Sequence, residues 1–271
     1  MKLKDKIVVI TGASSGIGKA LATEFALRGA NLVLASRQYV SLCQIAQQLQ
    51  QQFNIKAIAV QCDVAVEDDC AQLIKQTILT FGKIDVLINN AGISMRSLFK
   101  DVDLKVLKEL MDVNFWGTVY CTKHALPGII QTNGSIVGVS SIAGYKGLPG
   151  RSGYSASKFA VNGFLDALRV ENLQTGVHVM VACPGFTATN IRNTALNSKG
   201  NAQGESTLDE DKMMSAEEVA TIITNGVESR DRTLIMTFQG KLTVFLSKFL
   251  PAFLDKQVFK VFARERNSLL K

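Results

Sequence analysis

Residues 6–29, KIVVITGASSGIGKALATEFALRG, decide the fold of this 271-residue chain. The apolar, β-branched run at 6–11 predicts a buried parallel strand. A glycine turn at 12–18 follows, and the segment after it has the composition of a helix that ends at Gly29. A strand, a glycine turn and a helix in this order place backbone N–H groups and the positive end of a helix against a phosphate. The stretch therefore predicts a phosphate-binding turn, spaced GxxxGxG rather than GxGxxG.

The rest of the chain repeats this alternation of strand and helix. Further buried strands are predicted at 31–36, 56–61, 84–89, 135–140, 177–183 and 232–236. Helices are predicted at 38–52, 66–82, 103–131, 152–174 and 216–228. Residues 103–131 are predicted to form one long helix or two joined ones, with Asn114 in the middle. Asparagine competes for backbone groups, so this position invites a reason such as a local bulge. With 47% hydrophobic residues and no Pro- or Ser-rich linker, the chain suits one large α/β domain.

A second stretch, GVSSIAGYKGLPGRSGYSASK at 138–158, carries groups suited to acid–base chemistry. If Tyr154 opens a helix, Lys158 lies one turn further along the same face. A phenol has a pKa near ~10, and a nearby ammonium lowers it toward the range useful to a general acid–base. Ser141 could then hold a substrate oxygen by a hydrogen bond. Alternatively, a tyrosine and a lysine one turn apart occur by chance in many helices.

Polar and small residues follow several predicted strands, at the sheet edge where open α/β sheets bind ligands. Ser36-Arg37 offers a guanidinium and no carboxylate, which favours the 2′-phosphate of NADP over the free hydroxyl of NAD. A charge-assisted hydrogen bond of this kind contributes roughly 1.5–3 kcal/mol; the alternative is a solvated surface arginine. Asp63 is placed to cap a loop or to touch an adenine edge. Asn89-Asn90-Ala91-Gly92 lets the backbone pass close to a flat ligand, and Thr187 and Thr189 follow Pro184-Gly185.

Other residue types exclude several function classes. The five cysteines lack CxxC or metal spacing and are typical of reduced thiols, and with only His124 and His178 we expect no metal site and no histidine triad. The first strand begins near Met1 and no apolar run reaches ~18 residues, so we expect neither a signal peptide nor a membrane span. The net charge of +7 resides mostly in 241–271, which does not suit a nucleic-acid groove.

TGASSGIG (11–18), NNAG (89–92), Asn114, Ser141, YSASK (154–158) and PGFTAT (184–189) occur in this order. Over about 5–240 the chain therefore resembles the short-chain dehydrogenase/reductase family, in its shorter, carbonyl-reducing branch. The resemblance implies a Rossmann-type, doubly wound, seven-stranded parallel sheet and NAD(P)-linked interconversion of carbonyl and alcohol. It makes Tyr154 the acid–base residue and Ser141 the residue that positions the substrate oxygen. It also implies that Lys158 lowers the tyrosine pKa and binds the nicotinamide ribose, and that Asn114 supports a water-linked proton relay. The residues it implies for cofactor binding are Gly12, Ser14, Ser15, Gly16, Ile17, Gly18, Arg37, Asp63, Val64, Asn90, Ala91, Gly92, Tyr154, Lys158, Pro184, Gly185, Thr187 and Thr189.

The sequence divides into a catalytic NADP-binding domain at 1–240, with a lid loop at 186–214, and a basic, amphipathic helical extension at 241–271 in which Pro251 separates two helices. The extension resembles the tails of dehydrogenase/reductase member 7B-type and 11β-hydroxysteroid-dehydrogenase-like members. Its aromatic residues could pack against a second subunit and the substrate mouth, lie on an anionic bilayer, or complete the core. The first two alternatives predict a hydrophobic substrate.

The expected function is NADP(H)-dependent oxidoreduction of a hydrophobic ketone or aldehyde and its alcohol, in a cytoplasmic or peripheral membrane homodimer or homotetramer. A non-catalytic NADP-binding sensor or scaffold and an NAD-linked alcohol dehydrogenase of the same fold are the alternatives.

Overall fold

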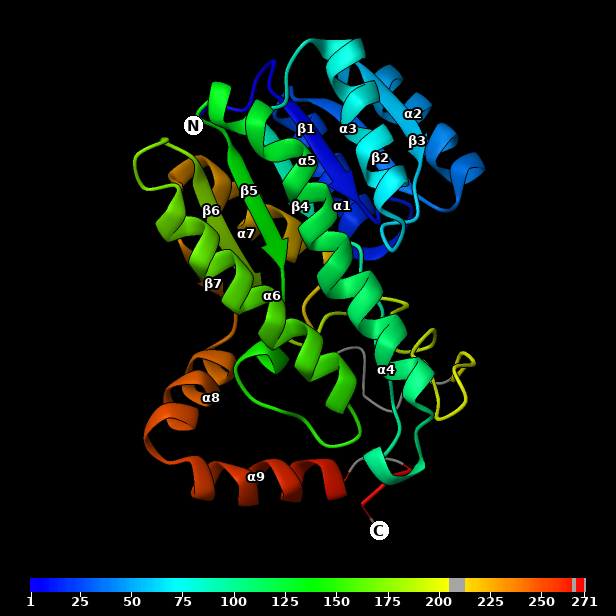
Figure 1. Cartoon of the computed structure of the whole chain (residues 1–271), viewed down its shortest axis with the longest axis vertical. Helices are drawn as coiled ribbons and strands as arrows, with labels where there is room; N and C mark the ends of the chain where they lie inside the picture. The colour runs from blue at the N-terminus through cyan, green and yellow to red at the C-terminus, as the bar shows by residue number, and fades with distance from the viewer. Residues whose placement is uncertain (205–212, 265–266, 271) are drawn as a thin grey trace.

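A computed structural model describes residues 1–204, 213–264 and 267–270 of the chain. The described residues form a seven-stranded parallel sheet in the order β3-β2-β1-β4-β5-β6-β7 (Figure 1). Its strands are β1 (Ile7–Thr11), β2 (Asn31–Ser36), β3 (Ala57–Gln61), β4 (Val86–Asn89), β5 (Ser135–Val139), β6 (His178–Cys183) and β7 (Thr233–Ile235). The order reverses between β1 and β4, which opens a crevice at the carboxyl ends of these strands. The predicted doubly wound sheet is confirmed.

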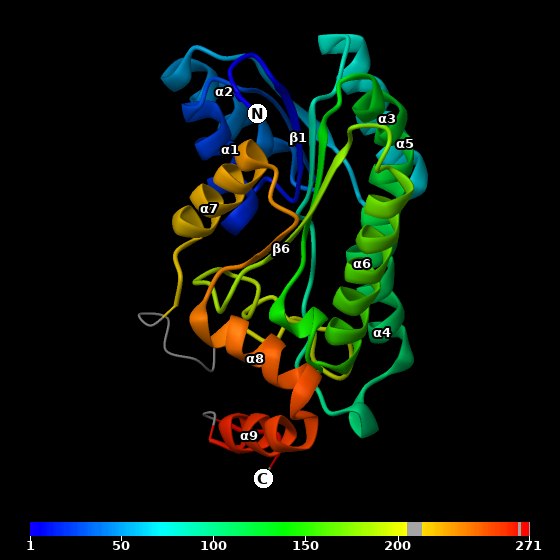
Figure 2. The same cartoon turned by 90° about the vertical axis from the view of Figure 1, so that its left-hand side faces the viewer.

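Helices cover both faces of the sheet (Figure 2). One face carries α1 (Gly16–Leu27), α2 (Tyr39–Phe53) and α7 (Ala216–Ser229), and the other carries α3 (Glu67–Phe81), α5 (Gly117–Gln131) and α6 (Ser152–Glu171). Alternate strand residues point to opposite faces, so Val8 and Ile10 of β1 join the first core while Ile7 and Val9 join the second. Strands buried on both faces explain the continuous apolar runs of the sequence.

The predicted helix at 103–131 is interrupted where the bulge was expected. It consists of α4 (Leu104–Met111), a π-helical turn at Asp112–Trp116 that contains Asn114, and α5. π-turns inside helices are frequent at functional sites. Here the turn gives the Asn114 side chain a buried position between two other segments, described below.

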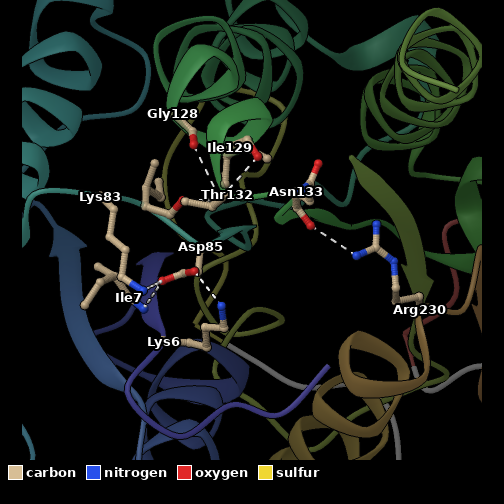
Figure 3. Close-up of polar contacts among 10 residues, drawn as sticks. Lys6, Ile7, Lys83, Asp85, Gly128, Ile129, Thr132, Asn133 and Arg230 are labelled. Atoms are coloured by element: carbon tan, nitrogen blue, oxygen red, sulfur yellow. Dashed lines mark hydrogen bonds and ion pairs between the residues drawn. The ribbon is translucent and has the colours of Figure 1, made fainter. Parts of the chain in front are cut away.

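A buried carboxylate fixes the opposite edge of the sheet, where the strands begin (Figure 3). Asp85 is 1% exposed and accepts hydrogen bonds from the Ile7 amide at 2.9 Å and the Lys6 ammonium at 2.9 Å, with the Lys83 ammonium at 3.0 Å. Burial acts to raise the pKa of Asp85, but these three groups outweigh it and the pKa lies below its usual range. The ionised Asp85 carboxylate therefore joins the starts of β1 and β4 at neutral pH.

The C-terminal extension forms α8 (Phe238–Phe249) and α9 (Pro251–Ala263), so the predicted break at Pro251 is confirmed. Helix α8 begins at Phe238, and the predicted domain boundary at residue 240 lies inside it. Both helices lie beyond the carboxyl edge of the sheet (Figures 1 and 2). None of the helices in the described part of the chain is both long and apolar enough to cross a bilayer.

The predicted lid at 186–214 is only partly within the described residues, since 205–212 lie outside them. Its first part is folded against the segment that follows β4. The Leu196 amide donates to the Ser94 carbonyl at 2.9 Å, the Arg96 amide donates back to the Leu196 carbonyl at 2.9 Å, and Leu196 is 9% exposed. This part of the loop is therefore packed in the structure, and its role as a lid stays a prediction.

Candidate active site

A cavity of about 610 Å³ follows the carboxyl ends of the central strands. The glycine turn after β1 and the polar residues after β2 and β3 line one end, and residues of β5, α6 and the segment after β6 line the other. Every residue predicted to bind a cofactor lines this cavity. It is therefore continuous from the phosphate-binding turn to Tyr154.

Two glycines of the turn allow it to pass close to the loop after β4. Gly12 has φ +65°, and a Cβ on Gly18 would lie 2.1 Å from the Gly12 carbonyl oxygen. The Asn90 amide group donates to the carbonyls of Thr11 and Gly12, at 2.9 and 3.3 Å. The Thr11 hydroxyl accepts from the amides of Asn90 and Ala91, at 3.0 and 3.1 Å. Asn90 thus ties the two turns together, and the predicted passage of the NNAG backbone close to a flat ligand stays a prediction.

The end of β2 places a guanidinium at the cavity, as expected. Arg37 is exposed, and its Nη1 lies 4.0 Å from Oδ2 of Asp63 at the end of β3. Asp63 also accepts a hydrogen bond from the Ala65 amide at 3.0 Å, which caps its own loop. Because both side chains remain solvent-accessible, their ion pair is weak and leaves the guanidinium able to bind an anion.

The other end of the cavity brings together Ser141, Tyr154 and Lys158. Ser141 follows β5, and its hydroxyl accepts from the Ala143 amide at 3.1 Å. Lys158 is 5% exposed; its Nζ donates to the Val139 carbonyl at 2.9 Å and lies 5.8 Å from the centroid of the Tyr154 ring. Burial lowers the pKa of Lys158 to about 8.

The prediction that Lys158 lowers the pKa of Tyr154 is wrong in this structure. Tyr154 is partly exposed to the cavity, yet burial raises its pKa above the ordinary value. A hydrogen bond with Ser141 and the guanidinium groups of Arg151 and Arg192 act in the opposite direction. The physical reason is that desolvation of the Tyr154 phenolate outweighs the groups that lower the pKa.

Asn114 lies behind the wall of the cavity, outside the residues that line it in the described part of the chain. Its Oδ1 accepts from the Ile93 amide at 2.8 Å, and its Nδ2 donates to the Ile93 carbonyl at 3.0 Å and to the Ser157 hydroxyl at 2.9 Å. The side chain therefore joins the loop after β4 to α6. Its predicted place in a proton relay stays a prediction.

Sequence reasoning missed two arginines that line the catalytic end, Arg151 and Arg192. Arg151 was visible in principle, because it directly precedes the helix of Tyr154 and lies three residues before that tyrosine. The rest of this end is mainly apolar; its walls include Ile93, Val113, Leu148, Phe186, Ile191 and Leu196. Among the described residues, the C-terminal extension contributes no side chain to the lining. Its packing against a second subunit and the substrate mouth stays one of the three alternatives.

A family model described as short chain dehydrogenase matches residues 6–200. The chain belongs to the short-chain dehydrogenase family. This short-chain dehydrogenase is 35% identical to "11-beta-hydroxysteroid dehydrogenase 1A" of Arabidopsis thaliana over 263 residues, which are 93% of this chain and 74% of that protein. It is 33% identical to "Dehydrogenase/reductase SDR family member 7B" of Mus musculus over 271 residues, 98% of this chain and 84% of that protein.

Two solved structures resemble the fold of this short-chain dehydrogenase. One is an alcohol dehydrogenase from Thermococcus sibiricus complexed with 5-hydroxy-NADP, with a TM-score of 0.77 and 25% identity over 86% of this chain and 96% of that one. The other is a short-chain dehydrogenase/reductase from Burkholderia phymatum in complex with NAD, with a TM-score of 0.81 and 25% identity over 95% and 96% of the two chains. The resemblance to an oxidoreductase family is therefore confirmed.

Proposed function

We propose that this short-chain dehydrogenase is an NADP(H)-dependent enzyme that interconverts an apolar ketone or aldehyde and its alcohol. The observation that carries the proposal is that Ser141, Tyr154 and Lys158 line the same cavity as the glycine turn and Arg37. The similar structures complexed with NAD and with 5-hydroxy-NADP support a nicotinamide cofactor. When bound, such a cofactor supplies or accepts the hydride, and the protein supplies orientation and a proton.

The residues present fit such a cofactor. The glycine turn exposes the amino end of α1 to the cavity, and the backbone N–H groups of this end suit a pyrophosphate. A Cβ at position 18 would fill the space inside the turn. At the other end, we expect Lys158 to bind the nicotinamide ribose. Between these two ends, the hydrogen bonds of Asn90 hold the loop after β4 against the glycine turn.

In carbonyl reduction, Tyr154 donates the proton of its hydroxyl to the substrate oxygen as negative charge develops there. The Ser141 hydroxyl donates a hydrogen bond to the same oxygen. In alcohol oxidation Tyr154 acts as the base, so its phenolate is the active form.

Arg37 is the basis for proposing NADP over NAD. Its guanidinium occupies the end of β2, where NAD-binding members of such folds use a carboxylate on the ribose hydroxyl. Replacing Arg37 by Ala should weaken NADPH binding by about ten- to a hundredfold, since a charge-assisted hydrogen bond contributes about 1.5–3 kcal/mol. NADH binding should change little. Equal losses for NADPH and NADH in fluorescence titrations would contradict the assignment.

The test of the proposed function is turnover with NADPH of benzaldehyde, acetophenone, cyclohexanone and cortisone. These substrates sample the size of the apolar end of the cavity. We expect turnover of at least one of them, and a loss of about a thousandfold in Tyr154→Phe, since positioned acid–base groups contribute about 10²–10⁴-fold. Tyr120→Phe is the matched control, because that phenol does not line the cavity. Equal turnover in wild type and Tyr154→Phe would refute the role of Tyr154, whereas NADPH binding without any turnover would favour the sensor alternative.

We also propose that α8 and α9 contact an anionic bilayer. Phe245, Phe249 and Phe253 are 57%, 66% and 51% exposed. The two helices carry four lysines, while their one carboxylate, Asp255, is paired with Lys146. A second copy would bring the same positive charge to this face, so an anionic surface is the better complement. Phe245→Ser with Phe249→Ser should abolish flotation with phosphatidylserine vesicles; if these substitutions instead dissociate an oligomer, the face binds a second copy.

A further inference from the structure

We propose that the C-terminal extension is part of the catalytic machinery: α9 holds the Arg151 guanidinium at the Tyr154 end of the cavity, where its charge supports the phenolate of Tyr154. The inference rests on the proposed function, because it requires Tyr154 to be the acid–base residue. Arg151 is therefore assigned as a positioning residue, which acts on the reaction through Tyr154. The role of the extension is to hold Arg151 in this position.

The backbone of Arg151 is fixed at the start of α6. Its amide donates to the Leu148 carbonyl at 3.1 Å, and its carbonyl accepts the first bond of the helix, from the Ser155 amide, at 2.8 Å. The side chain is 9% exposed and lines the cavity together with Tyr154. A guanidinium is the side-chain cation suited to such a buried position, because its planar group is more weakly hydrated than an ammonium.

Helix α9 supplies the other wall around this guanidinium. The Cζ atom of Arg151 lies 5.2 Å from the centroid of the Phe262 ring, within the range of a cation–π contact. Phe262 is 7% exposed, although most large apolar side chains of α8 and α9 are exposed. It is therefore one of the few residues of the extension that are buried, and its ring covers Arg151.

Other contacts of the extension reach residues 146–150, before α6, and Arg96, in the segment after β4. Asp255 of α9 forms an ion pair with Lys146. Leu269 packs beside Gly150, where an added Cβ would lie 3.0 Å from Leu269 Cδ1. After α9, the Asn267 carbonyl accepts a hydrogen bond from Arg96 at 2.6 Å. Figure 1 shows α9 lying beyond the amino-terminal end of α6, where the 146–150 segment enters the helix.

Several charged and titratable groups face Tyr154. Burial raises the pKa of Tyr154 most, Arg151 and Arg192 lower it, and the Cys183 thiol raises it. Lys158 lies 5.8 Å from the ring, and Glu109 of α4 lines the same cavity. Arg192 lies in a segment after β6, whereas Arg151 is the residue directly before α6, the helix that contains Tyr154. Removing the charge of Arg151 should therefore raise the pKa of Tyr154.

The experiment measures that pKa directly, in the full chain with saturating NADP⁺, by NMR of ¹³Cζ-labelled tyrosine. The chain has four tyrosines, and Tyr154→Phe assigns the signal. We expect Arg151→Gln to raise the pKa of Tyr154 by about one unit and Arg151→Lys to restore it in part. Phe262→Leu should raise it by a smaller amount, because the guanidinium is kept but no longer held by the ring. Phe259→Leu, on the exposed face of the same helix, should leave it unchanged.

The same substitution should also change the pH dependence of alcohol oxidation. Alcohol oxidation needs the phenolate, so the rising limb of kcat/KM against pH should move to higher pH in Arg151→Gln. A merely structural role would lower the melting temperature without moving this limb. If the pKa of Tyr154 is the same in Arg151→Gln, Phe262→Leu and wild type, the inference is wrong. If Tyr154→Phe retains full turnover, the proposed function itself is wrong; the two failures are therefore distinguishable.

Discussion

Replacing Gly18 by Ala tests whether the glycine turn is as tightly packed as the structure has it. The new Cβ would lie 2.1 Å from the Gly12 carbonyl oxygen and 2.6 Å from Nδ2 of Asn90. Relief of the first contact requires a movement of about 1 Å, because carbon atoms need more than about 3 Å from a non-bonded neighbour. The obstacle is backbone, so no side-chain rotation removes it. Such overpacking costs about 1–3 kcal/mol.

A second effect opposes this cost. Alanine is favoured over glycine inside a helix by about 1 kcal/mol, and Gly18 lies in α1. The clash exceeds this gain, so we expect Gly18→Ala to lose about 1–2 kcal/mol of unfolding free energy, with a melting temperature lower by about 5 °C. The displaced turn should also weaken NADPH binding by at least about tenfold.

Gly163→Ala is the matched control, because it lies inside α6 and no atom lies within 4 Å of its added Cβ. That variant should gain up to about 1 kcal/mol, from helix propensity alone. Both variants are compared by thermal unfolding and by fluorescence titration with NADPH. The reasoning is refuted if Gly18→Ala unfolds at the wild-type temperature and binds NADPH with the wild-type dissociation constant.

Two further predictions concern buried polar groups. Asp85→Ala should lose about 2 kcal/mol in urea unfolding at pH 7, because the buried Ile7 amide loses its charged acceptor. The pKa of Asp85 is lowered in the folded state, so its contribution is present at neutral pH and disappears as the pH falls below the ordinary carboxyl value of ~3.9; a constant wild-type–mutant difference down to acid unfolding would contradict this. Asn114→Ala should lose about 2 kcal/mol by the same assay, because it leaves the amide of Ile93 without its 2.8 Å partner; stability equal to wild type would show that this tie is dispensable.

Sequence patterns predicted most of the elements, because strands buried on both faces leave long apolar runs and helices leave a period of 3.6. They also predicted the interruption at Asn114 and the break at Pro251, since both follow from local backbone chemistry. The folded part of the lid was not predicted. Its burial depends on Leu196 meeting Ser94, two residues that are far apart in the sequence.

The electrostatics of the site could not be predicted in the same way. The spacing of Tyr154 and Lys158 placed them one helical turn apart, but it contained no information on their desolvation. In the folded chain, burial raises the pKa of Tyr154 and lowers that of Lys158. The sizes of such effects depend on every group packed around the pair, including Arg151.

By itself, the sequence determined the order of the strands and helices, the glycine turn and the polar residues at strand ends, because each follows from local conformation and from which face must be buried. Only the tertiary structure decided which charges meet at the Tyr154 end of the cavity. It placed Phe262 of the extension over Arg151, more than a hundred residues away along the chain, because packing at the carboxyl edge of the sheet brings α9 against the start of α6.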